Sequence, residues 1–183
     1  NNFKDKYYLM RLKKFFFKKV KSTNETAIRL IKRGEKNGII SSDIQTNGKG
    51  QRGKKWISKK GNLFLTIFFK INNQLSIKKL TFLNLSILKK IITNQIKVKT
   101  HVKLPNDILI YKQKVCGILQ EIIFKNNIKY LIIGIGINII TSPIIENYPT
   151  TYLNKYSKKK INKIKLINEI KLIFEKKYKD KIL

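Results

Sequence analysis

The sequence predicts an α+β fold, in which helices pack against a mixed, largely antiparallel sheet. Short β-rich apolar runs recur along the chain, and those between residues 98 and 140 follow one another with only tight turns between them, as in a meander. Three other segments carry apolar residues at helical spacing, namely residues 24–34, 77–93 and 161–180. Without a repeat or a long linker, the 183 residues are expected to form one domain.

The first half of the chain alternates strands and helices. FFFKKV, residues 15–20, predicts a strand, and NETAIRLIKRG, residues 24–34, predicts a helix that Asn24 caps and Gly34 ends. IISSDIQT at 39–46 and NLFLTIFFK at 62–70 predict two strands on either side of a glycine-rich loop. The helix at 77–93 follows and is expected to pack on the core.

Turn residues divide the second half into strands. The turns are predicted at Pro105-Asn106-Asp107, Lys112-Gln113 and Asn126-Asn127. Residues 141–160 are expected to form a loop, and residues 161–180 an amphipathic helix with apolar positions from Ile164 to Phe174.

Composition excludes several classes of protein. Cys116 is the only cysteine and His101 the only histidine, so neither an internal disulfide nor a zinc cluster is expected. The longest apolar run, LIIGIGINII, is too short to span a bilayer, and the basic N-terminus lacks a signal-peptide pattern. These features predict a soluble, cytoplasmic protein with no membrane partner.

The formal net charge is +31, which is typical of nucleic-acid binding proteins. Here lysine, isoleucine and asparagine are abundant throughout the chain, so the charge indicates a compositional bias spread over a solvated surface rather than one binding face. An RNA-binding module remains the alternative from a different class. The aromatic residues of YYLMRLKK and FFFKK, which such a module would expose, are expected to pack in the core.

QTNGKGQRGKKW, residues 45–56, places three glycines among four cations and ends at the only tryptophan. Glycines let backbone N–H groups approach a ligand closely, and the cations supply charge-assisted hydrogen bonds. The pattern is neither GxxxxGK[ST] nor a GxGxxG that opens a helix. It predicts a loop for an anion, with a mobile surface loop as the alternative.

Three later motifs place polar groups and glycines near predicted strands. KLPNDILI offers Asn106 for hydrogen bonding and Asp107 to coordinate magnesium or to orient a lysine. KVCGILQE carries Lys114 and Gly117, and IGIGIN carries Gly134 and Asn138. Glycines on neighbouring strands predict a flat floor for a ligand.

Taken together, KSTNETA, QTNGKGQRGKKWIS, GNLFLTIFF, KLPNDILI, KVCGILQE and IGIGIN resemble, in order and spacing, the catalytic domain of biotin protein ligases. The resemblance covers about residues 17–153. It implies the fold shared by class II aminoacyl-tRNA synthetases and biotin synthetases. It also implies an ATP-dependent ligase that forms biotinyl-5′-adenylate and transfers biotin to a lysine of a biotin carboxyl carrier domain.

The resemblance assigns roles residue by residue, with biotin, ATP and Mg²⁺ as ligands. Lys114 and Lys103 are the candidate catalytic residues, and Lys114 would bridge the biotin carboxylate and the α-phosphate. The candidate biotin-binding residues are Ser22, Thr23, Asn24, Gln45, Lys49, Gly50, Gln51, Lys114, Gly117 and Gly134. The candidate ATP-binding residues are Lys49, Arg52, Trp56, Asn106, Asp107, Lys114 and Asn138, and Asp107 is also the candidate Mg²⁺ ligand.

Several features depart from the family pattern. Lys49 and Gln51 replace arginines of a GRGRRG loop, and Leu104 replaces the tryptophan of KWPND. We expect one catalytic domain in residues 1–183, with neither an N-terminal winged helix nor a C-terminal small β-barrel. DNA binding is therefore not expected, and a homodimer remains open. The alternative within the same fold is a lipoate or octanoate ligase, although such a site needs an apolar tunnel rather than the polar Ser22 to Asn24 set.

Overall fold

The computed structural model describes residues 10–72 and 74–179. Within them the chain forms one seven-stranded sheet in the order β1-β2-β3-β7-β6-β5-β4, and only β1 and β2 pair in parallel. The strands are β1 (Lys14–Val20), β2 (Asn37–Gln45), β3 (Leu63–Lys70), β4 (Thr100–Lys103), β5 (Asp107–Ile110), β6 (Gln113–Lys125) and β7 (Ile128–Ile137). The predicted α+β class and the mixed, largely antiparallel sheet are confirmed.

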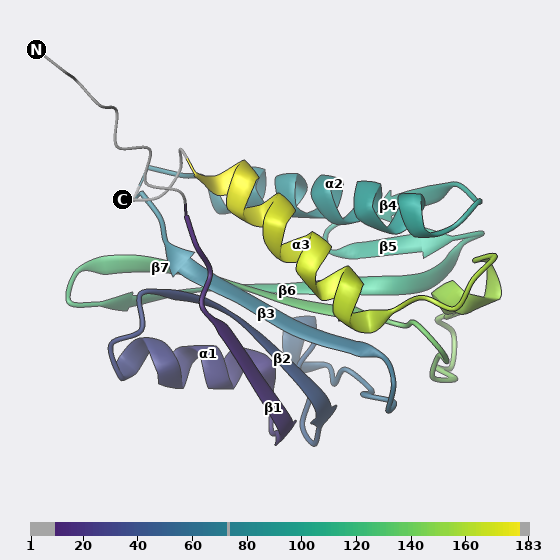
Figure 1. The fold of residues 1–183 in the computed structure, drawn as a ribbon, viewed down its shortest axis with the longest axis horizontal. Coiled ribbons are helices and arrows are strands. Elements are labelled where there is room, and N and C mark those ends of the chain that lie inside the picture. Colours follow the sequence, from purple (N-terminus) through teal and green to yellow (C-terminus); the bar gives the residue numbers. More distant parts are fainter. Residues whose placement is uncertain (1–9, 73, 180–183) are drawn as a thin grey trace, which may run out of the picture.

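Helices cover both faces of the sheet (Figure 1). The α-helices are α1 (Thr23–Lys32), α2 (Ile77–Gln95) and α3 (Lys163–Tyr178), and short 3-10 turns occur at η1 (Gln51–Gly53) and η2 (Leu153–Lys155). α1 lies on one face, whereas α2 and α3 lie on the other (Figure 1). The inner strand β3 is therefore buried on both sides, which explains its continuous apolar sequence.

Two clusters of buried side chains hold the helices to the sheet. The larger one joins α2 and α3 to the sheet through residues such as Leu88, Phe174 and Leu65, and the smaller one joins α1 to it through Ala27 and Phe68. Leu65 and Phe68 both belong to β3 and serve opposite faces, because side chains alternate along a strand.

Asn24 does not cap α1, contrary to the prediction. Ser22 holds the extended conformation that an N-cap requires, and its carbonyl oxygen accepts a hydrogen bond from the Thr26 N–H at 3.0 Å. Asn24 lies inside the first turn and is 3% exposed. Gly34 does end the helix, in a left-handed conformation with φ +108°.

Three other expectations are corrected in detail. The hairpin turn between β5 and β6 is formed by Tyr111 and Lys112, both with positive φ, one residue earlier than predicted. Ile164 and Leu172 of α3 are exposed, because the helix buries only the stripe that contains Leu166 and Ile170. Phe16 was expected to pack in the core but is exposed, since its neighbours in β1 point the other way. The aromatic residues of YYLMRLKK lie outside the described residues.

Candidate active site

One pocket of about 590 Å³ opens on the face of the sheet that α1 covers. It is lined by the start of α1, the end of β2, the glycine-rich loop, β6, β7 and two later loops. Every predicted site residue except Asn138 lines this pocket, although these residues are spread over more than a hundred positions of the chain.

The start of α1 and the end of β2 form a polar end of the pocket. Gln45 Oε1 accepts hydrogen bonds from the Thr23 N–H at 2.8 Å and from the Thr23 hydroxyl at 3.1 Å, and Gln45 Nε2 donates to Ser58 Oγ at 3.1 Å. Ser22 and Asn24 line the same end. The residues predicted for the ureido group of biotin therefore lie close together in the pocket.

Asn24 is fixed by three partners. Its Oδ1 accepts from Thr66 Oγ1 at 2.7 Å, and its Nδ2 donates to Glu121 Oε2 at 2.6 Å and to the Leu119 carbonyl oxygen at 3.3 Å. A Cβ added at Gly134 would lie 2.4 Å from Asn24 Oδ1, so the amide rests on the space that this glycine leaves. Asn24 thus stiffens the polar end, and one acceptor site on its oxygen remains for a ligand.

Backbone hydrogen bonds close the glycine-rich loop into a tight hairpin. The Gly50 N–H donates to the Lys54 carbonyl oxygen at 2.7 Å, and the Trp56 N–H donates to the Gly48 carbonyl oxygen at 2.9 Å. A Cβ on Gly48 would lie 2.6 Å from the Trp56 carbonyl oxygen, so only glycine fits this approach. The loop turns back through Arg52, whose φ is 54°.

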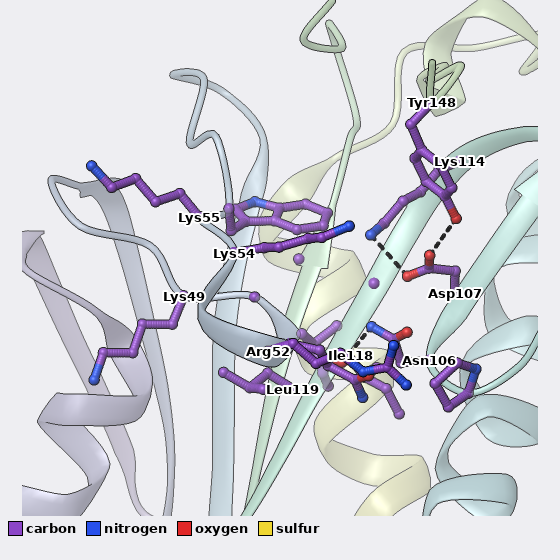
Figure 2. Close-up of a pocket in the computed structure, with 18 of the residues that line it drawn as sticks. Lys49, Arg52, Lys54, Lys55, Asn106, Asp107, Lys114, Ile118, Leu119 and Tyr148 are labelled. Carbon is purple, nitrogen blue, oxygen red and sulfur yellow. Dashed lines mark hydrogen bonds and ion pairs between the residues drawn. The ribbon is translucent and has the colours of Figure 1, made fainter. Parts of the chain in front are cut away.

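The cations of this loop point in different directions (Figure 2). Arg52 and Lys54 reach across toward the side formed by Asn106 and Asp107, whereas Lys49 and Lys55 point away. Lys49 Nζ lies 2.8 Å from Glu25 Oε1, and this hydrogen bond raises the pKa of Lys49 above its ordinary value. The structure therefore places Arg52, rather than Lys49, where an anion could be held.

Trp56 lies over the glycine floor that the sequence predicted. Gly117 and Gly136 face each other across β6 and β7, and a Cβ at either would come within 2.9 Å of the indole. Trp56 Nε1 is buried and has no hydrogen-bond partner among the described residues. The indole therefore lies on the flat surface of Gly117 and Gly136, and its Nε1–H is a donor that a ligand could satisfy.

Lys114 forms the charged centre of the pocket with Asp107 and Tyr148 (Figure 2). Its Nζ lies 2.8 Å from Asp107 Oδ1, 5.2 Å from the Trp56 ring centroid and 5.6 Å from that of Tyr148. The Tyr148 hydroxyl donates to Asp107 Oδ2 at 2.6 Å. Of the two roles predicted for Asp107, orienting a lysine is the one that this geometry contains.

Lys103 and Asn106 complete the side of the pocket opposite the glycine loop. Lys103 Nζ lies 4.4 Å from the Tyr148 ring centroid at the exposed rim. Asn106 also lines the pocket, and its Nδ2 donates to the Ile118 carbonyl oxygen at 3.2 Å. Both residues therefore belong to the pocket that the other predicted site residues share.

Asn138 is the predicted site residue that the structure does not bring into the pocket. It is 2% exposed, its Nδ2 donates to the Thr151 carbonyl oxygen at 3.1 Å, and its Oδ1 accepts from Asn62 at 3.4 Å. Its amide ties β7 to the segment after it, because the strand ends there and the side chain turns inward.

The sequence analysis missed Tyr148, Gly136 and Lys54 as site residues. Tyr148 lies in a loop without any motif, 41 residues from its partner Asp107. Gly136 belongs to the IGIGIN motif, from which only Gly134 and Asn138 were predicted as site residues. The signal that identifies Gly136 is its pairing with Gly117 across β6 and β7, which depends on the register of the two strands.

Residues 16–138 match the biotin/lipoate A/B protein ligase family. The chain belongs to this family. Among curated proteins it is 32% identical over 169 residues to the bifunctional ligase/repressor BirA of Bacillus subtilis and 28% identical over 135 residues to that of Escherichia coli. These matches cover 87% and 70% of this chain.

The chain spans about half the length of the Bacillus relative, 51%, and 41% of the Escherichia coli one. The biotin protein ligase of Aquifex aeolicus, solved with biotin and ATP, is 25% identical with a TM-score of 0.76 over 93% of this chain and 73% of that one. The Leishmania major enzyme, solved with biotinyl-5-AMP, has the same TM-score at 24% identity, with 93% and 76% of the two chains covered. The ligase family fold, related to class II synthetases, is therefore confirmed.

Within residues 10–72 and 74–179, no helix of this family member is long and apolar enough to cross a membrane.

Proposed function

We propose that this chain activates biotin with ATP as biotinyl-5′-adenylate and then transfers the biotinyl group to a lysine of a carrier domain. The observation that carries the proposal is a single pocket with two chemically different ends. Ser22, Thr23 and Gln45 form a neutral, hydrogen-bonding end, and Lys114 and Arg52 lie in the cationic part. A ligand with a ureido group at one end and a carboxylate at the other matches this division.

The first step is limited by charge. An oxygen of the biotin carboxylate attacks the α-phosphorus of ATP, the bond to the bridging oxygen breaks, and pyrophosphate leaves. Both reacting groups are anions, so a positioned cation lowers the barrier more than any proton transfer could. We assign this role to Lys114, because it lines the cationic part of the pocket and its ammonium contacts Asp107, Trp56 and Tyr148.

The second step uses the mixed anhydride. The neutral amine of an acceptor lysine attacks the biotinyl carbonyl carbon, AMP leaves with the bonding electrons, and the amine gives up one proton. The assignment of the acceptor to a biotin carboxyl carrier domain rests on the family resemblance. The cytoplasmic location stays a prediction based on the lone Cys116.

Magnesium is expected to arrive with the nucleotide. The carboxylates that line the described pocket are Asp107 and Glu146, and the described residues contain no cluster of three or more His, Cys, Asp or Glu side chains. This donor set suits Mg²⁺, which proteins commonly hold with one or two carboxylates plus phosphate oxygens. Asp107, whose oxygens contact Lys114 and Tyr148, would be a ligand of the metal, and the metal would neutralise phosphate charge.

The polar end favours biotin over lipoate. A dithiolane ring offers no N–H donors to Gln45 or to the hydroxyls of Ser22 and Thr23, whereas a ureido group does. Desolvating that hydrogen-bonded set with an apolar ring would leave polar groups unpaired.

Exchange of labelled pyrophosphate into ATP tests the proposal, since it isolates the first step and needs no carrier. We expect exchange that depends on biotin and is not supported by lipoate or octanoate. Exchange with lipoate instead of biotin would assign the chain to the other branch of its family. No exchange with any of these acids, together with a salt-sensitive shift of RNA, would favour the RNA-binding alternative.

A further inference from the structure

Tyr148 belongs to a segment that is fixed to Lys114 by backbone hydrogen bonds. The Lys114 N–H donates to the Pro149 carbonyl oxygen at 2.8 Å, and the Thr151 N–H donates to the Lys114 carbonyl oxygen at 2.8 Å. The two strands of chain thus form a short parallel bridge between Lys114 and Thr150. The position of the Tyr148 ring relative to Lys114 is set by the main chain rather than by a flexible side-chain contact.

The carboxylate of Asp107 is divided between two partners. Oδ2 accepts the Tyr148 hydroxyl at 2.6 Å, and Oδ1 lies 2.8 Å from Lys114 Nζ. Oδ1 is buried and its contact with Lys114 is an ion pair without the alignment of a directional hydrogen bond. The Tyr148 hydrogen bond is therefore the directional contact that fixes how the carboxylate is turned.

The end of the Lys114 side chain lies over Gly117. A Cβ at that glycine would come within 2.9 Å of Lys114 Cε and 3.0 Å of Nζ, so the ammonium uses the space that the glycine leaves. Since Asp107 pairs with Gly117 in the register of β5 and β6, carboxylate and ammonium meet at one point of the sheet. Small rotations of the carboxylate would move the ammonium toward or away from the pocket.

From this geometry we propose that Tyr148 is a positioning residue for the adenylation step. Its hydroxyl holds Asp107 so that a single carboxylate oxygen faces Lys114, and Lys114 consequently presents its ammonium to the pocket. This inference rests on the proposed function. Without the hydroxyl, the carboxylate can turn and engage Lys114 with both oxygens, which draws the ammonium away from the two anions that it must neutralise.

Steady-state pyrophosphate exchange with Tyr148→Phe tests the inference, because this change removes the hydroxyl and keeps the ring. We expect kcat to fall about tenfold and the KM for biotin to stay within about twofold, since the polar end is untouched. Tyr111→Phe is the matched control. Tyr111 is 66% exposed, lies outside the pocket and should exchange like the wild type.

A double-mutant cycle separates positioning from a general structural role. In an Asp107→Ala background, Tyr148→Phe should cause no further loss, because the hydroxyl acts through a carboxylate that is no longer present. Asp107→Leu, which is close to aspartate in size and also lacks an acceptor, serves if the alanine variant does not fold.

The outcomes are distinguishable. A wild-type protein without biotin-dependent exchange overturns the proposed function and this inference together. Normal wild-type exchange with an unchanged Tyr148→Phe variant overturns only the inference. Independent losses that multiply in the double variant, or a rise in biotin KM without a fall in kcat, would also overturn it.

Discussion

The Trp56 indole packs directly on the backbone of Gly136, because a Cβ added to this glycine would clash with two atoms of the ring. We therefore expect Gly136→Ala to displace the ring and weaken nucleotide binding. Because Trp56 is the only tryptophan, all tryptophan emission comes from this ring. The emission should shift to the red in Gly136→Ala.

Gly134→Ala is the matched control, since its added methyl would meet Asn24 instead of the indole. It should leave the emission unchanged and weaken biotin binding. Equal spectra for the wild type and Gly136→Ala would contradict the position assigned to Trp56.

Lys114→Ala should nearly abolish adenylate formation while the protein stays folded. One ammonium offsets two converging anions, and removing such a contact from a closed site costs roughly 3 kcal/mol of barrier. Pyrophosphate exchange measures the loss, and circular dichroism checks the fold. Lys112→Ala, an exposed lysine in the neighbouring turn, is the control. Exchange within about threefold of the wild type would remove Lys114 from its assigned role.

The glycine-rich loop, residues 47–55, should be the preferred trypsin site of the free protein. Of its four cations, Lys49 is paired with Glu25, whereas Arg52, Lys54 and Lys55 form no salt bridge among the described residues. Its glycines also raise the entropy lost on ordering. Biotin with ATP supplies the missing anion and should protect the loop from cleavage. Mass spectrometry of the fragments measures the rate of cleavage in this loop. Equal rates with and without the ligands would show that the ligands do not order the loop.

Gln51→Arg should slow the escape of biotinyl-adenylate. A neutral amide supplies neither the charge nor the paired donors of an arginine, so the intermediate is held less tightly by this chain. The effect is measured as the rate at which preformed adenylate is released after rapid dilution of the complex. Biotinylation of an unrelated protein should fall in parallel.

Arg52 provides the counterpart of that test. On an extended segment Arg52 would point away from Gln51, because side chains alternate along a strand. Instead, its left-handed conformation in η1 directs it across the pocket (Figure 2). Arg52→Gln should accordingly speed release. If release is unchanged in both variants, neither position governs retention of the adenylate.

Cys116 should be nearly inert toward a disulfide reagent while the protein is folded. It is fully buried beside the site, and burial, aided by Asp107, raises the pKa of its thiol above the ordinary value. The thiolate is the reacting form, so labelling in mildly alkaline buffer has to wait for opening of the structure. Only in denaturant should the reagent label Cys116 as fast as it labels a free small-molecule thiol. A fast reaction of the native protein would contradict the packing of β6.

Local physics made much of the fold readable from the sequence. The helix at 77–93 and the strand at 62–70 followed from spacing that depends on neighbours within a few residues. Paired asparagines at 126 and 127 marked a hairpin because they tolerate positive φ. The glycine-rich loop was recognisable for the same reason, since it needs only composition and adjacency.

Long-range packing decided what the side chains do within that frame. Asn138, Lys49 and Tyr148 show this most clearly: the first turned inward to Thr151, the second paired with Glu25, and the third met Asp107. Each of these contacts joins residues that are distant in sequence, and each depends on strand register and on where a loop crosses. The chain thus specified its elements and the types of its polar groups locally, whereas only the assembled sheet determined which of those groups face the ligand and which hold one another.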